Sequence, residues 1–394
     1  MRILRCYEYD TLRIGQHYGE VRFTQADWHN IARWQQSQER TYCRILPDAV
    51  QWQQYVGLVQ VEGLSVEILP KLDRDTAPQD ALYDLLLPML DRCRYVPIAR
   101  ARGQVGTQPG RLMALFVRAF VERVERMVRQ GLLLSYRTEV GPSAALRGRL
   151  MLGQQLTRTD ARFYTQRSAY RYAHPYYGII RAALEALVGV EGVQRSVVRR
   201  LLAHFPAEKV GRGTQLPSVL DARFRPYQAT FSMAQMILSQ YRPGIGAGRL
   251  PFFSMLFDMN VLYEDYVYQL LAALDLPEIT VTRRAVRPFW ERTELQPDIV
   301  LQDGTDRYVL DTKWKLANPT TADLQQMYTY TRFYEAETAI LLYPGAVTTT
   351  TVPSPYLDDS GVHCAVLRLP IVRNGRLNDG LGREILAYLR HRRP

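Results

Sequence analysis

The 394-residue sequence lacks the patterns that mark several large classes of protein. Its four cysteines lie far apart without a CxxC pair, so neither a disulfide framework nor a cysteine-rich zinc site is supported. The six histidines are scattered and form no HExxH motif. No apolar run is long enough to span a bilayer, and the N-terminus lacks the basic-then-apolar layout of a signal peptide. We therefore expect a cytoplasmic protein that does not insert into membranes.

Lysine is also rare, although the chain carries a formal net charge of +11. Among its 50 basic residues only Lys71, Lys209, Lys313 and Lys315 are lysines. Two of the four fall in one short segment, which indicates that a compact ammonium is needed there. The charge is uneven, with 35 basic against 21 acidic residues up to residue 250 and 15 against 18 after it. A basic excess favours polyanions such as nucleic acid, although it also suits acidic protein partners.

The patterns along the chain predict a multi-domain α/β protein. Residues 1–100 are expected to be β-rich, with a hairpin around Gly63 and a helix over 78–93 that Pro88 kinks or ends. Residues 101–245 are expected to be mostly helical and arginine-rich, with one amphipathic helix ending at Gly131 and others over 174–190, 193–204 and 226–241. The arginines and aromatic residues interleaved there fit either nucleic-acid contact or a protein interface.

A Gly/Pro stretch, "RPGIGAGRLP", reads as a linker to a third domain over residues 250–394. We expect a long helix over 253–274, a β-hairpin over 297–315 and a helix over 323–334. "TAILLYPG" is an apolar run typical of a buried strand, and "CAVLRLPIV" and "GREILAYLRHR" add a strand and a helix. This order predicts an α/β domain with a mixed sheet.

The hairpin carries two carboxylates and a lysine near one end. If its turn is residues 303–306, Asp298 lies directly opposite Asp311, and if the turn is 303–304 the two are diagonal. Both registers place the carboxylates and Lys313 on one face, with Thr312 and Trp314 on the other, because side chains alternate with period two.

Adjacent carboxylates repel each other unless a cation joins them, and Mg²⁺ is commonly held by one or two carboxylates. The neighbouring Lys313 could orient a water molecule or offset charge on a phosphate, as phosphodiester hydrolysis requires. The alternative is a solvated hairpin edge with a surface salt bridge.

These residues resemble a known motif. Pro297-Asp298 and Asp311-Thr312-Lys313 resemble the PD-(D/E)XK motif of a nuclease superfamily. More of the chain is similar to the McrC family, the nuclease subunit of McrBC-type, modification-dependent restriction systems. The segments that carry this resemblance span nearly the whole chain: "VGLVQVEGLSVEILPKL", "RQGLLLSY", "LRGRL", "LFDMNVLYEDYV", "DTKWK", "DLQQMYTY" and "LLYPG".

The resemblance implies a DNA endonuclease that uses Mg²⁺, or Mn²⁺ in its place. Its implied metal ligands are Asp298, Asp311, the carbonyl of Thr312, and Glu264. Lys313 would be the catalytic lysine, and Gln326 would support that lysine or a phosphate.

The resemblance also implies an McrB-like AAA+ GTPase hexamer as partner. This chain has no GxxxxGK[ST] motif, so we do not expect it to hydrolyse the nucleotide itself. Residues 1–100 would dock that partner, which would read the modification on double-stranded, methylated DNA. Two alternatives stay open: a non-catalytic adaptor that stimulates an AAA+ motor, and an autonomous PD-(D/E)XK nuclease.

Overall fold

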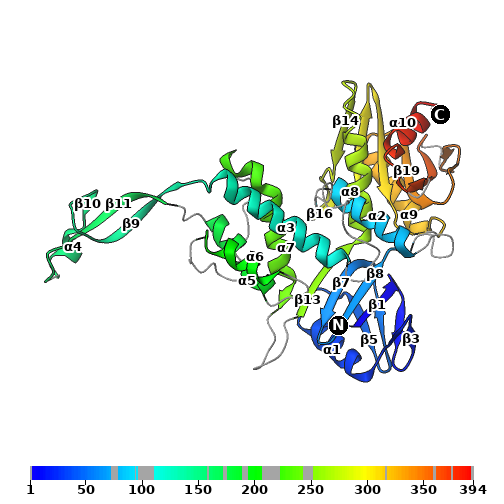
Figure 1. The fold of residues 1–394 in the computed structure, drawn as a ribbon. Helices are drawn as coiled ribbons and strands as arrows, with labels where there is room; N and C mark the ends of the chain where they lie inside the picture. The colour runs from blue at the N-terminus through cyan, green and yellow to red at the C-terminus, as the bar shows by residue number, and fades with distance from the viewer. Residues whose placement is uncertain are drawn as a thin grey trace. The chain divides into compact units, whose positions relative to one another are not determined.

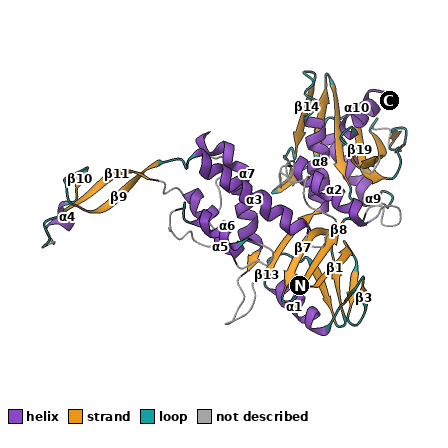
Figure 2. Ribbon diagram, in the orientation of Figure 1, coloured by secondary structure: helices purple, strands orange, loops and turns teal. Residues whose placement is uncertain are grey.

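The computed structural model describes residues 2–71, 79–93, 95, 111–157, 159–171, 175–188, 194–205, 222–242, 252–315, 317–357, 361–373 and 376–391. The chain forms two compact units, one of residues 1–112 with 254–394 and one of residues 113–253 (Figure 1). The predicted segments 1–100 and 250–394 thus fall almost entirely in the same unit, and the three-domain division stays a prediction. Figure 2 shows helices and strands in both units, as the α/β prediction requires.

The N-terminal segment is β-rich, as predicted. The hairpin around Gly63 is formed by β7 (Tyr55–Val61) and β8 (Leu64–Leu69), and Gly63 adopts a φ of 73° in the turn. In this unit the sheet runs β1-β8-β7-β13, with β1 (Arg2–Tyr7) parallel to β8. Around it lie β2 (Thr11–Arg13), β3 (His17–Tyr18), β4 (Val21–Arg22), α1 (Gln25–Gln36), β5 (Cys43–Leu46) and β6 (Ala49–Trp52).

The predicted helix over 253–274 is wrong in its first part. Residues Phe252–Asp258 form strand β13, and helix α8 covers only Met259–Ala272. Asp258 ends the strand and caps the helix, because its side chain accepts a hydrogen bond from the backbone of Asn260 at 3.0 Å. The strand lies so close to β7 that a Cβ on Gly57 would sit 2.0 Å from the carbonyl oxygen of Met255.

The C-terminal segment contains the predicted mixed sheet. Its strand order is β14-β17-β18-β19-β22-β20, with β21 beside β22. The β18–β19 and β19–β22 pairs are parallel, whereas the β14–β17, β17–β18 and β20–β22 pairs are antiparallel. The strands are β14 (Ile279–Arg283), β17 (Ile299–Asp303), β18 (Asp306–Thr312), β19 (Thr338–Gly345), β20 (Thr349–Thr350), β21 (Ser354–Pro355) and β22 (His363–Pro370).

Helices cover both faces of this sheet. The predicted helices appear as α9 (Thr321–Tyr334) and α10 (Leu381–His391), and "TAILLYPG" is the buried strand β19. Met327 and Tyr330 of α9 pack on Val309 of β18. Trp314, which the sequence predicts to point to the other face, packs its ring against Tyr263 of α8. Helix α2 (Gln79–Arg92) contains Pro88 and does not end there. The unit also contains two hairpins, β15 (Arg287–Trp290) with β16 (Thr293–Leu295) and β23 (Val372–Arg373) with β24 (Arg376–Leu377).

The second unit contains the predicted helices and one sheet that was not predicted. Gly131, at a φ of 85°, follows α3 (Arg111–Gln130), which confirms the expected helix end. The other helices are α4 (Leu152–Gln155), α5 (Pro175–Val188), α6 (Arg195–Leu202), a 3-10 helix (Ala222–Tyr227) and α7 (Gln228–Gln240). The strands are β9 (Ser135–Ser143), β10 (Arg149–Leu150) and β11 (Phe163–Arg171), which form the extra sheet, and β12 (Tyr241–Arg242). Nearly all of the predicted linker lies outside the described residues.

No helix in the described ranges combines the length and the apolar character needed to cross a membrane.

Candidate active site

The β17–β18 hairpin has the first of the two predicted registers. Gln302 pairs with Arg307 and Asp303 pairs with Asp306, which leaves Gly304 and Thr305 as a two-residue loop. Gly304 adopts a φ of 62°, a backbone conformation that glycine tolerates and most residues do not. Continued to the open end, the register places Asp298 opposite Asp311.

Asp298 is fixed by the strand opposite. Its Oδ2 atom accepts hydrogen bonds from the backbone N–H and the hydroxyl of Thr312, both at 2.7 Å. The sequence predicted that the Thr312 side chain points to the other face of the hairpin, yet its hydroxyl contacts Asp298. Asp298 precedes the first residue of β17, so its side chain is free to turn across the end of the ladder toward Thr312.

Lys313 lies at the centre of a group of polar side chains. Its Nζ is 2.6 Å from Oδ2 of Asp311 and 3.6 Å from Oδ1 of Asp323, and it donates to Oε1 of Gln326 at 3.2 Å. The backbone N–H of Lys313 donates to the carbonyl of Leu342 in β19 at 2.8 Å. The strand and three neighbouring side chains therefore hold this ammonium in place.

Helix α9 supplies the side chains around the lysine. Gln326 is half-buried and faces the site, whereas its neighbour Gln325 is exposed. The Gln326 amide donates to the Tyr330 hydroxyl at 3.0 Å, and that hydroxyl donates to the carbonyl of Gln296 at 3.2 Å. This chain of hydrogen bonds links the lysine to the segment that leads into Asp298.

The start of α9 is fixed by a capping box. The Thr320 hydroxyl accepts from the backbone of Asp323, and Asp323 in turn accepts from the backbone of Thr320. Asp323 also accepts from Lys315 at 2.8 Å. Both lysines of the hairpin therefore have Asp323 as a neighbour.

The electrostatics of the carboxylates indicate a site short of positive charge. Burial, together with the charge of Asp311, raises the pKa of Asp298 to about 7. Burial also raises the pKa of Asp311, although Lys313 opposes this. Burial would lower the pKa of Lys313, but Asp311 and Asp323 outweigh it and raise the pKa. The lysine therefore stays protonated while the two aspartates resist ionisation.

Glu264 is engaged by arginines. It lies on α8 with 6% of its surface exposed, and it accepts from Nε of Arg283 at 2.9 Å and from Arg284 at 2.7 and 2.8 Å. The adjacent Asp265 pairs with Arg283 and accepts from Tyr95. The structure thus brings Asp298, Asp311 and Thr312 together but leaves no carboxylate oxygen of Glu264 free of an arginine.

The metal assignment stays a prediction. Within the described ranges no group of three or more His, Cys, Asp or Glu side chains is arranged to hold a metal ion. Asp311 is 3% exposed, and its Oδ2 has the ion pair with Lys313 but no hydrogen bond of good geometry. A buried, poorly satisfied carboxylate oxygen beside a second carboxylate fits a hard cation with oxygen ligands.

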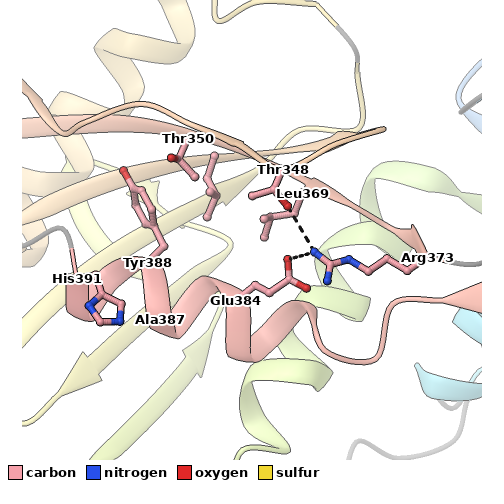
Figure 3. Close-up of a pocket in the computed structure, with 9 residues that line it drawn as sticks. Thr348, Thr350, Leu369, Arg373, Glu384, Ala387, Tyr388 and His391 are labelled. Carbon is pink, nitrogen blue, oxygen red and sulfur yellow. Dashed lines mark hydrogen bonds and ion pairs between the residues drawn. The ribbon is translucent and has the colours of Figure 1, made fainter.

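A separate cavity of about 380 Å³ lies elsewhere in the same unit (Figure 3). Arg373 spans its wall and pairs with Glu384 at 2.8 Å, with the Thr348 hydroxyl 3.5 Å away. Its other lining residues are Thr350, Leu367, Leu369, Ala387, Tyr388 and His391. None of the predicted site residues lines it, so the candidate site depends on the hairpin end rather than on this cavity.

Several residues of the candidate site were not predicted from the sequence. Arg283, Arg284 and Tyr330 contact predicted site residues, yet no motif marks them. Asp323 had a visible signal, since Thr320 and Asp323 have the spacing of a capping box. The buried hydrogen bond from Trp314 to Glu8, at 2.7 Å, joins positions 306 residues apart and has no local signal.

Comparisons with known proteins agree with this fold. Residues 50–344 match the profile of the family described as McrBC 5-methylcytosine restriction system component. The chain is similar to one in a refined half-complex from a tetradecameric assembly of Thermococcus gammatolerans McrB AAA+ hexamers with bound McrC, at 16% identity and a TM-score of 0.65. That alignment covers 98% of this chain and 100% of the other.

A second similar structure is the cryo-EM structure of the Thermococcus gammatolerans McrBC complex, at 16% identity and a TM-score of 0.49, covering 68% of this chain and 87% of the other. None of the curated proteins matches the sequence.

The family match spans most of the chain and includes every residue of the candidate site, from Glu264 to Gln326. The chain therefore belongs to the McrBC 5-methylcytosine restriction system component family.

Proposed function

We propose that this chain is the McrC subunit of an McrBC-type restriction complex and that it is a Mg²⁺-dependent endodeoxyribonuclease with a PD-(D/E)XK catalytic domain. The observation that carries the proposal is the placement of Asp298, Asp311 and Lys313 at one end of a buried hairpin, in a chain of this family. The substrate is double-stranded DNA that contains methylated cytosine, which the family description supports. The complex acts in the cytoplasm.

Asp298 and Asp311 are the residues that would hold the metal. Both are carboxylates in surroundings that raise their pKa, so a divalent cation would relieve their mutual repulsion. Mn²⁺ could replace Mg²⁺, because both prefer oxygen ligands. When bound, the metal supplies an activated water and neutralises phosphate charge. Thr312 holds Asp298 in place through two hydrogen bonds.

Lys313 would act as a fixed positive charge. Its raised pKa keeps the ammonium protonated, so it offsets negative charge on the phosphate under attack rather than accepting a proton. Gln326 and Tyr330 fix the direction of the ammonium through their hydrogen bonds. Together these side chains bind and orient a phosphodiester at the end of the hairpin.

The partner in this proposal is an McrB-like AAA+ GTPase hexamer. The similarity to a chain from a structure of McrB AAA+ hexamers with bound McrC supports it. The sequence contains no GxxxxGK[ST] motif, so GTP hydrolysis falls to the partner. We assign docking of the partner to residues 1–100.

Cleavage of methylated and unmethylated plasmid tests the proposal. Wild type and Asp311→Ala are each assayed with Mg²⁺ or EDTA, and with or without the AAA+ partner and GTP. Asp306→Asn is the matched control, because Asp306 lies on the same strand at the opposite end of the hairpin. We expect cleavage of methylated plasmid only with metal, partner and GTP, and only from wild type and the control.

Each other outcome has a distinct meaning. Cleavage without the partner would identify an autonomous nuclease. Failure of wild type to cut under every condition, while it still stimulates the partner's GTPase, would show that the chain is an adaptor and would refute the catalytic role of the hairpin.

A further inference from the structure

Glu264 is held by a bidentate contact from one arginine. Arg284 donates from Nε to Oε1 at 2.7 Å and from its terminal nitrogen to Oε2 at 2.8 Å, so both carboxylate oxygens are engaged. Arg283 adds one bond to Oε1 and is shared with Asp265. Bidentate pairs of this kind are strong and directional, which makes Arg284 the main partner of Glu264.

The backbone of Arg284 is held in an unusual conformation. Its φ of 48° lies in the left-handed region, which a bulky residue adopts at a cost. Arg284 directly follows β14, and its backbone N–H donates to the carbonyl of Asp298 at 2.9 Å. Arg284 thus contacts Asp298 through its backbone and Glu264 through its side chain.

The two partners differ in access to solvent. The Arg284 side chain is 41% exposed, whereas that of Glu264 is 8% exposed. A polyanion approaching the site can therefore reach the guanidinium without moving α8.

We propose that Arg284 withholds Glu264 from the metal site until a phosphate of bound DNA takes the arginine. The guanidinium exchanges the two oxygens of a carboxylate for two oxygens of a phosphate, since its fork fits carboxylates and phosphates alike. Glu264, released from its main partner, would then be available as a further carboxylate ligand for the cation that Asp298 and Asp311 would hold. The inference rests on the proposed metal-dependent nuclease function and adds that DNA binding completes the metal site.

Titration calorimetry of Mn²⁺ into the full chain without DNA tests the proposal with a readout other than cleavage. Arg284→Gln removes the charge that holds Glu264, so we expect Mn²⁺ to bind roughly ten- to hundredfold more tightly. Arg284→Gly is a second variant that suits the φ of 48° and removes strain, and we expect the same tightening. Arg287→Gln is the matched control, because Arg287 contacts the Phe333 carbonyl instead, and its Mn²⁺ affinity should equal that of wild type.

The role of Glu264 is tested in the same titration. Glu264→Gln in the wild-type background should leave Mn²⁺ affinity unchanged, and in the Arg284→Gln background it should cancel the gain. DNA binding in EDTA is the second readout. There, Arg284→Gln should lower the slope of log affinity against log salt by about 0.9, the effect of one lost phosphate contact.

Mn²⁺ binding by Arg284→Gln and Arg284→Gly that is unchanged or weaker than in wild type would overturn the inference. So would a loss of Mn²⁺ affinity on Glu264→Gln alone, since Glu264 would then already be a ligand without DNA. Wild type that neither binds Mn²⁺ through Asp298 nor cuts DNA would instead refute the proposed function. If wild type binds Mn²⁺ and cuts DNA, but the Arg284 variants bind Mn²⁺ no more tightly than wild type, only the role of Arg284 is refuted.

Discussion

Replacing Asp298 with asparagine should make the fold more stable at high pH while removing activity. The pKa of Asp298 rises from 3.8 to about 7 because of burial and the charge of Asp311. Ionising a carboxyl whose pKa is raised in the fold costs free energy of folding, so the penalty is present above pH 7 and disappears as the pH falls toward 4. At about 1.36 kcal/mol per pKa unit, the penalty reaches roughly 4 kcal/mol.

The asparagine keeps the geometry and removes the charge. Its carbonyl oxygen can accept the same two hydrogen bonds from Thr312 that Oδ2 accepts. In EDTA at pH 8 we therefore expect Asp298→Asn to raise the free energy of unfolding by about 2 to 4 kcal/mol. At pH 5 the gain should nearly vanish. Saturating Mg²⁺ at pH 8 should stabilise the wild type and leave the variant unchanged.

Denaturant unfolding at the two pH values measures this, with Asp303→Asn as the contrasting control. Asp303 is buried on the same hairpin but accepts two hydrogen bonds from Arg390, at 2.9 and 3.0 Å. Its replacement should cost about 1 to 3 kcal/mol at pH 8. An Asp298→Asn variant that is no more stable than wild type at pH 8, or equally stabilised at pH 5, would show that burial and the charge of Asp311 do not penalise the ionised Asp298 as described.

Three further substitutions test the supporting structure, each by thermal denaturation. Trp314→Phe removes the donor to buried Glu8 and should cost about 1 to 3 kcal/mol, and an unchanged melting temperature would contradict that contact. Gly57→Ala places a Cβ against the β13 backbone and should cost more than about 3 kcal/mol, whereas Gly153→Ala, in open space, should not. Thr320→Ala removes the cap of α9 and should cost about 1 kcal/mol; no loss would mean that the capping box is not needed.

The hairpin could be predicted from the sequence because its information is local. The period of two places Asp298, Asp311 and Lys313 together, and the residues around Gly304 permit only a few turns, one of which the structure adopts. Gln326 was indicated only by the family resemblance, and it is the fold that turns it toward Lys313 and leaves the neighbouring Gln325 exposed.

The remaining parts depend on contacts between distant segments. β13 was taken for a helix because a short apolar run fits either structure, and what decides is the neighbouring β7 strand. The pairing of Glu264 with Arg283 and Arg284 depends on how α8 packs beside β14. The same holds for Trp314 and Glu8, which only the folded chain brings together.

The chain's use of lysine now has a structural reason. A chain that otherwise carries its positive charge on arginine places two of its four lysines at 313 and 315. The Lys313 ammonium lies within 3.6 Å of oxygens from Asp311, Gln326 and Asp323, which come from a strand and a helix in different directions. A compact ammonium with three donors satisfies such a set, whereas the planar guanidinium fork suits two oxygens of one group, as Arg284 on Glu264 shows. The choice between the two cations follows the geometry of the anions that each one meets.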